Sequence, residues 1–323
     1  MQSSACPFPR RTLTLTPAQT LSIPFMPAIF KNPYLLLTIT ALFWGGNAIA
    51  GKFAIDHVSP MVLTFGRWAI ALTIIGIIGR AHIANDWQKL KQRWFYLLMM
   101  GGFGYTAFNF ALYSALHYTS AINITIEQTA MPFFIFVISF LVYRTSIQSL
   151  QIIGYALTVI GVIVTATNGT PLALLEGTSG LNRGDLIMLG GGIFYAAYSV
   201  GLRAKPDIHW QSFLASLIAG GVVFASFGLF YEMARGELLF PTTFQGAAVV
   251  AYAGIFPSLV SQGFFLAGVA AIGANRAGIF INLVPVFAAI LSVMMLGEQL
   301  YPYHALAFCL VVGGVLIAQR GTR

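Results

Sequence analysis

The chain has 323 residues, of which 58% are hydrophobic and only 8% are charged, and its formal net charge is +8. A soluble domain has roughly a quarter charged residues, so this composition excludes an ordinary water-soluble protein and indicates a surface in contact with lipid. The positive charge does not indicate a nucleic-acid partner, because Lys and Arg stand singly between long apolar runs and form no basic stripe.

The first 32 residues differ from the rest of the chain. They hold Arg10, Arg11 and four prolines before Phe25, and they contain no acid. No apolar run in this segment is long enough for a signal peptide. We expect a disordered cytoplasmic extension over residues 1–32, with an organellar transit peptide or a natural start at Met26 as alternatives.

From Pro33 onward the chain consists of apolar runs long enough to span a bilayer, which takes about 20 residues. Turn-forming residues such as Asn, Asp and Pro separate these runs, and the short connections favour antiparallel neighbours. We predict an all-α polytopic membrane protein with ten transmembrane helices, at residues 33–53, 60–79, 94–116, 121–143, 149–167, 184–203, 211–231, 246–270, 277–296 and 303–319.

The positions of Lys and Arg predict the orientation of these spans. With the N-terminus in the cytoplasm, thirteen of the seventeen basic residues fall in inner segments. Lys52, Arg183 and Arg235 fall at outer ends, and Arg67 lies within the second span. Cytoplasmic loops are the ones enriched in Lys and Arg. We therefore expect both termini in the cytoplasm and a plasma-membrane location, which is the inner membrane in a Gram-negative bacterium.

The two halves of the chain resemble each other. A shift of 153 residues lays the third-to-fifth spans on the eighth-to-tenth, and a shift of 150 lays Trp44 on Phe194. Five spans per half require the halves to insert in opposite senses, as in the inverted repeats of secondary transporters, which bind substrate near the midplane. The matched pairs at 153 residues are Gly101 with Gly254, Phe103 with Phe256, Ala121 with Ala274, Pro132 with Pro285, Phe134 with Phe287, Ser139 with Ser292 and Gly161 with Gly314.

Several short motifs, in this order, resemble the drug/metabolite transporter superfamily, EamA type. They are Phe43-Trp44-Gly45-Gly46-Asn47, Gly66-Arg67-Trp68, Leu112-Tyr113-Ser114-Ala115-Leu116 with Tyr118-Thr119-Ser120-Ala121, and Leu296-Gly297-Glu298. The resemblance implies two EamA-like five-helix repeats, at 33–167 and 184–319, cytoplasmic termini, and export of amino acids or related metabolites. The first half departs from the family by having Arg144-Thr145 where a second Gly-Glu is usual.

Polar and aromatic residues form stripes along several of the predicted spans. Polar groups in lipid are costly and normally face a bundle interior or an aqueous cavity, although they also join helices through hydrogen bonds. We predict that these stripes line one substrate cavity, with simple helix–helix bonding as the alternative. The predicted cavity residues are Trp44, Asn47, Tyr105, Asn109, Tyr113, Glu127, Tyr195, Tyr198, Gln262, Phe265 and Asn282.

Two prolines and two charged residues stand out within the spans. Pro132 and Pro285 each remove a backbone donor in mid-helix and predict kinks, either hinges or static bends. Arg67 is a lone intramembrane cation that would pair structurally or bind a substrate carboxylate. Glu127 lies about six residues inside the fourth span. It would be a proton-coupling site, a binding site for a substrate amine, or one half of an ion pair with a residue such as Arg67.

Enzyme motifs are absent from the sequence, which has no G-x-S-x-G, no P-loop lysine motif and no H-E-x-x-H. Cys6 and Cys309 form no CxxC pair, so we expect no metal site and no cofactor. We therefore predict a secondary transporter, not an enzyme, whose partners are a small-molecule substrate and the lipid bilayer. An intramembrane enzyme acting on lipid and a channel or scaffold are the alternatives, and the sequence leaves the oligomeric state open.

Overall fold

The computed structural model describes residues 32–144, 148–174 and 182–320, and the predicted extension at 1–32 lies outside them except for Asn32. Ten helices in these ranges are long and apolar enough to cross a membrane, which confirms the predicted count. Leu141, Ile77 and Phe227 are about two-thirds exposed, as expected of side chains that face lipid.

Six of the ten spans are single helices and four are interrupted. The single spans are α1 (Pro33–Ala54), α2 (Pro60–Ile78), α8 (Ser149–Ala166), α9 (Arg183–Gly201, continued by η4, Leu202–Ala204), α10 (Trp210–Ala234) and α15 (Pro302–Arg320). The interrupted spans are α4 (Trp94–Gly101) with η2 (Gly102–Ala107) and α5 (Phe108–Ala115); α6 (Ala121–Gln128) with α7 (Met131–Tyr143); α11 (Phe244–Ile255) with η5 (Phe256–Val260) and α12 (Ser261–Ile272); and α13 (Ala274–Ile281) with α14 (Leu283–Leu291) and η6 (Ser292–Leu296). A short 3-10 turn, η3 (Pro171–Leu174), lies between the fifth and sixth spans.

The interruptions follow the internal repeat. Helices α6 and α13 end at Gln128 and Ile281, which lie 153 residues apart, and each break is followed within a few residues by Pro132 or Pro285. The π-helical turns η2 and η5 also occupy equivalent stretches of the third and eighth spans. A π-turn leaves carbonyls of the preceding turn free and is frequent at functional sites. The two halves are therefore related in backbone geometry as well as in sequence.

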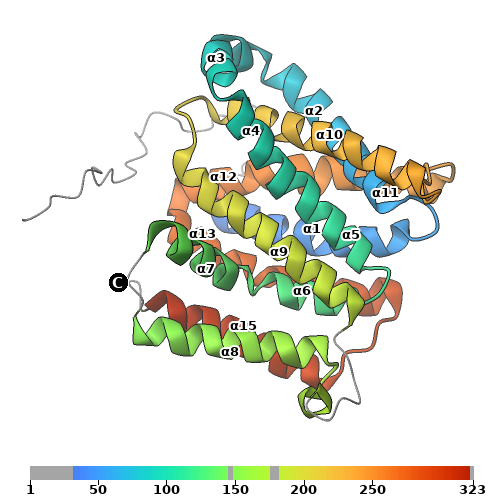
Figure 1. The fold of residues 1–323 in the computed structure, drawn as a ribbon, viewed down its shortest axis with the longest axis vertical. Helices are drawn as coiled ribbons and strands as arrows, with labels where there is room; N and C mark the ends of the chain where they lie inside the picture. The colour runs from blue at the N-terminus through green and yellow to red at the C-terminus, as the bar shows by residue number, and fades with distance from the viewer. Residues whose placement is uncertain (1–31, 145–147, 175–181, 321–323) are drawn as a thin grey trace, which may run out of the picture.

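Helices α8 and α15 lie side by side (Figure 1). They pack through small residues related by the same repeat. A Cβ at Gly154 would lie 2.5 Å from the Ala318 nitrogen, and a Cβ at Gly314 would lie 2.6 Å from Thr158 Oγ1. A Cβ at Gly161, the repeat partner of Gly314, would lie 2.9 Å from the Ala307 carbonyl. Glycine is needed because the two backbones approach this closely, as is common between membrane helices.

The connection between the second and third predicted spans contains a further helix. This helix, α3 (Arg80–Gln92), carries basic residues and lies across the end of the bundle beside α2, α4 and α10 (Figure 1). Its Asp86 accepts a hydrogen bond from the His209 backbone at 2.9 Å, and Lys89 donates to the Asp207 carbonyl at 2.8 Å. Helix α3 packs one face against α10 and leaves its charged face exposed to water.

Two acids, the buried Glu232 and the half-buried Glu298, cap the first turns of other helices. Glu232 in α10 accepts hydrogen bonds from Ser59 Oγ at 2.5 Å and the Met61 nitrogen at 2.8 Å, at the start of α2. Glu298 accepts from the nitrogens of Ala121 and Ile122 at 2.9 and 3.2 Å, at the start of α6. A carboxylate suits this position because the first N–H groups of a helix have no intrahelical partner and carry partial positive charge.

Candidate functional site

A buried polar network surrounds Arg67, in the middle of α2. The Arg67 side chain is only 3% exposed. Its Nε donates to Ser258 Oγ at 2.9 Å, and one terminal nitrogen donates to Asn109 Oδ1 at 2.5 Å, to Asn47 Oδ1 at 3.1 Å and to the Tyr113 hydroxyl. Tyr113 in turn donates to Asn47 Oδ1 at 2.8 Å. The network therefore joins α1, α2 and α5 of the first repeat to η5 of the second.

The two π-helical turns position the members of this network. Ser258 lies in η5 and donates its own hydroxyl to the Ala253 carbonyl at 2.7 Å, which orients its oxygen toward Arg67. The Tyr105 carbonyl in η2 accepts from Asn109 Nδ2 at 2.7 Å and from Trp68 Nε1 at 3.1 Å. Because an extra residue in each turn frees these carbonyls, the side chains that bond to them are fixed in orientation.

All oxygens that bind Arg67 in the described structure belong to neutral side chains, and the ion pair recorded there joins Arg235 to Glu237 instead. The guanidinium also lies 4.7 Å from the centre of the Trp68 ring and 5.7 Å from that of Tyr113. A buried cation without a counter-anion is costly, and dipoles and aromatic faces compensate it only in part. The site is therefore electropositive and suited to an anion.

Three predicted tyrosines form an aromatic cluster next to this network. The ring of Tyr105 is tilted against that of Trp68 at 4.5 Å between ring centres, and Tyr198 lies 5.8 Å from Tyr105 and 5.7 Å from Tyr195. The ring of Tyr198 lies directly against Gly104 in η2, where any Cβ would clash with it. The cluster joins α9 to the third span and extends the site toward the middle of the bundle.

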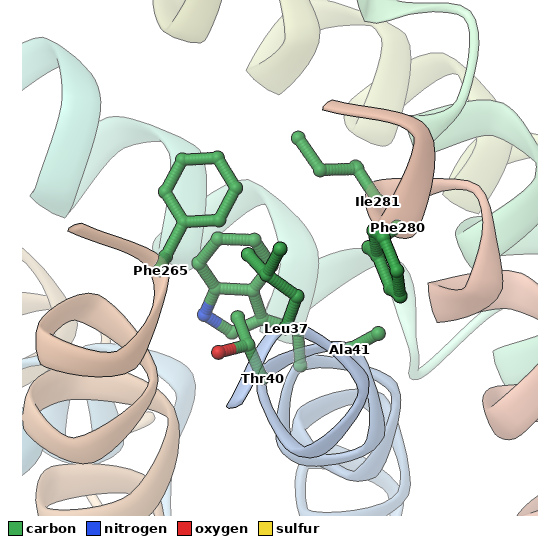
Figure 2. Close-up of a pocket in the computed structure, with 7 residues that line it drawn as sticks. Leu37, Thr40, Ala41, Phe265, Phe280 and Ile281 are labelled. Carbon is green, nitrogen blue, oxygen red and sulfur yellow. The ribbon is translucent and has the colours of Figure 1, made fainter. Parts of the chain in front are cut away.

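Trp44 lies in α1 one turn before Asn47, and Phe265 lies in α12. Trp44 Nε1 donates to the Pro257 carbonyl of η5 at 3.2 Å, and its ring lies 5.4 Å from that of Phe265. Both rings line a narrow apolar crevice with Leu37, Thr40 and Ala41 of α1 and with Phe280 and Ile281 of α13. Figure 2 shows Phe265 and Phe280 on opposite sides of the α1 residues.

Some of the predicted cavity residues lie outside the hydrogen-bond network around Arg67. Gln262 and Asn282 are half-buried and do not belong to the hydrogen bonds around Arg67. Arg67 and Glu127 do not form the ion pair that we considered, because the partners of Arg67 are the neutral groups above. The spans that contain Pro132 and Pro285 are each interrupted, in the manner of the predicted kinks.

Glu127 instead faces Asp185, in the first turn of α9. Glu127 and Asp185 are 2% and 0% exposed, and their four carboxyl oxygens have no hydrogen bond among the described residues. The sequence analysis missed Asp185. The available signal was its place at the second residue of a predicted span in a chain with only nine acids, because an acid at that depth needs an explanation.

A polar pocket of about 420 Å³ lies at the predicted outer end of the bundle, above these two acids. Lys52, at the end of α1, donates to the Leu116 carbonyl at 2.7 Å and helps to close this end. Burial lowers the pKa of His117, which therefore stays neutral at neutral pH. The pocket is lined by Lys52, His117, Tyr118, Thr119, Ser120, Asn123, Asn168, Asn182, Glu298, Gln299, Tyr301, Tyr303 and His304.

The chain is similar to transporters of bacteria and archaea. YyaM and YetK of Bacillus subtilis (strain 168), both described as uncharacterized transporters, are each 25% identical to it, over 289 and 295 residues. These matches cover 89% of this chain and 93% of YyaM, and 88% of this chain and 86% of YetK. An uncharacterized transporter of Archaeoglobus fulgidus is 24% identical over 293 residues, which cover 89% of this chain and 97% of the relative.

A solved crystal structure has a similar fold, with a TM-score of 0.59, 19% sequence identity, and coverage of 90% of this chain and 98% of the other. The EamA-like transporter family matches the chain twice, over residues 31–167 and 182–319. These ranges together span most of the sequence and contain all ten spans. The protein is therefore a membrane transporter that belongs to the EamA-like transporter family.

Proposed function

We propose that this protein is a secondary transporter that exports small polar metabolites by alternating access, with amino acids and related carboxylate-bearing compounds favoured. The observation that carries this proposal is Arg67, a buried cation whose described partners are all neutral. A substrate carboxylate would supply the missing negative charge, and a guanidinium binds a carboxylate through two parallel hydrogen bonds.

The position of the network supports alternating access. Arg67 is bonded to Asn47 and Asn109 of the first repeat and to Ser258 of the second. A substrate bound here would contact both repeats, and inverted-repeat transporters move their halves around a site of this kind. The breaks near Pro132 and Pro285 place bends at equivalent depths in the two halves.

The distribution of charge supports the plasma membrane and cytoplasmic termini. Lys and Arg are concentrated on the end of the bundle that carries α3, while the opposite end carries the polar pocket with Lys52 and Glu298. Basic residues remain on the cytoplasmic side during insertion. Export then begins with substrate entering from the α3 end and finishes with release toward the pocket.

Uptake and efflux by purified protein in proteoliposomes test this proposal. We expect transport of some members of a panel of radiolabelled metabolites, and rejection of the same molecules when the carboxylate is replaced by a carboxamide. Arg67→Gln should lower transport of the carboxylate form about tenfold to a hundredfold, since a charge-assisted hydrogen bond contributes about 1.5–3 kcal/mol. Arg235→Gln, at a solvent-exposed arginine, is the matched control and should leave transport unchanged.

Two outcomes would contradict the proposal. Equal transport of carboxylate substrates by Arg67→Gln and wild type, with both folded, would assign Arg67 to helix packing. Transport that does not saturate and shows no exchange would indicate a channel.

A further inference from the structure

Glu127 and Asp185 belong to different helices that are held together by close backbone packing. A Cβ at Gly184 would lie 2.6 Å from the Ala115 carbonyl and 2.9 Å from Thr119 Cγ2, so the first turn of α9 presses against the end of the third span. This contact places Asp185, the next residue after Gly184, close to Thr119 and beside α6. The carboxyl groups of Glu127 and Asp185 are close enough to interact directly with each other.

The burial of both acids leaves an electrostatic problem. All four oxygens are inaccessible and unpaired among the described residues, and no ion pair to Glu127 or Asp185 is formed there. Two neighbouring carboxylates without a counter-cation cannot both stay ionised in a medium of low dielectric, because their repulsion adds to the cost of desolvation. At least one positive charge must therefore reside between them.

The surrounding side chains do not supply that charge. Imidazole Nδ1 of His304 accepts from the Tyr301 nitrogen at 3.0 Å, and Nε2 lies 3.1 Å from Asn123 Oδ1, which is the bonding of a neutral ring. Lys52 is bonded to the Leu116 carbonyl, and Arg183 lies over the Tyr118 ring. The other titratable and charged groups on the elements packed against α6 or α9 are Tyr34 and Lys52 of α1, Tyr105 of η2, Tyr113 of α5, Tyr143 of α7, Tyr155 of α8, Arg183, Tyr195 and Tyr198 of α9, Arg203 of η4, and Tyr303, His304, Cys309 and Arg320 of α15. Glu298 caps the start of α6.

We propose that Glu127 and Asp185 form a proton-binding site in which one proton is shared between two carboxyl groups, and that binding and release of this proton drive transport. The coupling rests on the proposed transport function, whereas proton binding by the pair does not. The repeat partner of Glu127, at 153 residues, is Phe280 in the apolar crevice, so the repeat does not duplicate the site, which joins α6 of the first repeat to α9 of the second.

Helix geometry decides which of the two acids holds the proton. Glu127 lies in the last turn of α6, where the partial negative charge of the helix end disfavours a carboxylate. Asp185 lies in the first turn of α9, where the partial positive charge favours one. The proton therefore resides on Glu127, which donates it toward an ionised Asp185.

A polar route connects this pair to the outer end of the bundle. Thr119 and Asn123 both line the 420 Å³ pocket, and Asn123 lies one helical turn before Glu127 on α6. Asn123 is itself held by Thr119, Asn168 and His304 through hydrogen bonds of 3.4, 3.3 and 3.1 Å. A small rotation of α9 away from Thr119 would open the pair to water in the pocket and allow proton exchange.

Infrared spectroscopy of the full chain in lipid vesicles, without substrate, tests proton binding directly. Wild-type protein at pH 7 should show the carbonyl-stretch band of a buried protonated carboxyl group. Glu127→Gln should abolish this band, because Asp185 then remains ionised and accepts from the new amide. Asp185→Asn should retain it, because the buried Glu127 stays protonated, and this second variant keeps the test decisive if Glu127→Gln folds poorly.

Glu232→Gln is the matched control, since Glu232 is another buried acid but is fully hydrogen-bonded to Ser59 and Met61. It should leave the band unchanged. A wild-type spectrum without the band, or an identical band in Glu127→Gln, would overturn the proposal. A band that disappears on adding sodium ions at constant pH would also overturn it, by showing that a metal cation occupies the pair.

Transport measurements then test the coupling separately. With any substrate from the metabolite panel, Glu127→Gln should lose the response to an imposed pH gradient while retaining substrate exchange. Retention of the gradient response would remove the coupling role. Absence of transport for the whole panel in wild-type protein would contradict the proposed function, while the spectroscopic result would still stand.

Discussion

At the scale of single residues, the main feature is a cation satisfied by neutral groups. Arg67 is bonded by two Asn oxygens, a Ser hydroxyl and a Tyr hydroxyl, all 7% exposed or less. Such a network is stable only while every member is present, because an unpaired polar group in a dry interior costs more than a hydrogen bond contributes.

Tyr113→Phe therefore should destabilise the protein measurably. The hydroxyl that it removes is bonded to both Arg67 and Asn47, so we expect a loss of about 1–3 kcal/mol and a lower thermal unfolding temperature in detergent. Tyr155→Phe is the control, because that ring packs on Phe136 at the periphery of the bundle. Equal unfolding temperatures for the two variants would argue against a cooperative network.

Cysteine accessibility should differ among the predicted cavity residues. In a background without Cys6 and Cys309, cysteines replacing Gln262 and Asn282 should react with water-soluble thiol reagents faster than cysteines replacing Asn47 and Asn109. The first two positions are half-buried, whereas Asn47 and Asn109 are 7% and 5% exposed. Substrate should protect all four if they line one cavity. Faster labelling at Asn47 and Asn109 would show that the Arg67 network opens readily.

At the scale of helices, small residues decide how closely the two repeats approach. Gly154 and Gly314 meet directly between α8 and α15. Their repeat partners, Ala307 and Gly161, meet further along the same two helices. Lipid tails are as apolar as the side chains of these helices, so the pairing is stabilised in lipid by close packing.

Gly314→Ala should consequently lower the thermal stability of the bundle. Its Cβ would lie 2.6 Å from Thr158 Oγ1 and 2.8 Å from the Thr158 nitrogen, and overpacking of this kind costs about 1–3 kcal/mol. The neighbouring Gly313→Ala is a matched control, since its Cβ would meet nothing within 4 Å. Gly313→Ala should be neutral or slightly stabilising, because alanine favours helix more than glycine does. Indistinguishable melting curves would show that α8 and α15 separate easily.

At the scale of the whole molecule, two five-helix repeats cross the membrane in opposite directions. The Arg67 network joins the two halves, and so does the carboxyl pair, with Glu127 in the first half and Asp185 in the second. The two halves differ mainly in chemistry. The helix breaks and the π-turns η2 and η5 repeat, although η6 matches an α-helical stretch of α7, whereas Arg67 aligns with Leu217 at 150 residues and Glu127 with Phe280 at 153.

Reporter fusions should establish the orientation of this fold. A reporter after Arg323 should be active on the cytoplasmic side, and one inserted in the loop near Glu176 should be active outside, because basic residues gather at the end that carries α3. If both fusions report the same side of the membrane, the arrangement of ten spans with five in each half is contradicted.

The sequence alone determined the ten spans, the repeat and the family, because apolar run length, periodic glycines and short motifs are local properties of the chain. It also placed Asn47, Asn109 and Tyr113 on polar helix faces and Arg67 within the second span. The tertiary structure alone decided which faces meet. It joined those four residues to Ser258, separated Arg67 from Glu127, and brought Asp185 to Glu127 through the close contact at Gly184. Contacts between spans far apart in the chain depend on helix rotation and crossing, which residue spacing within one helix does not specify.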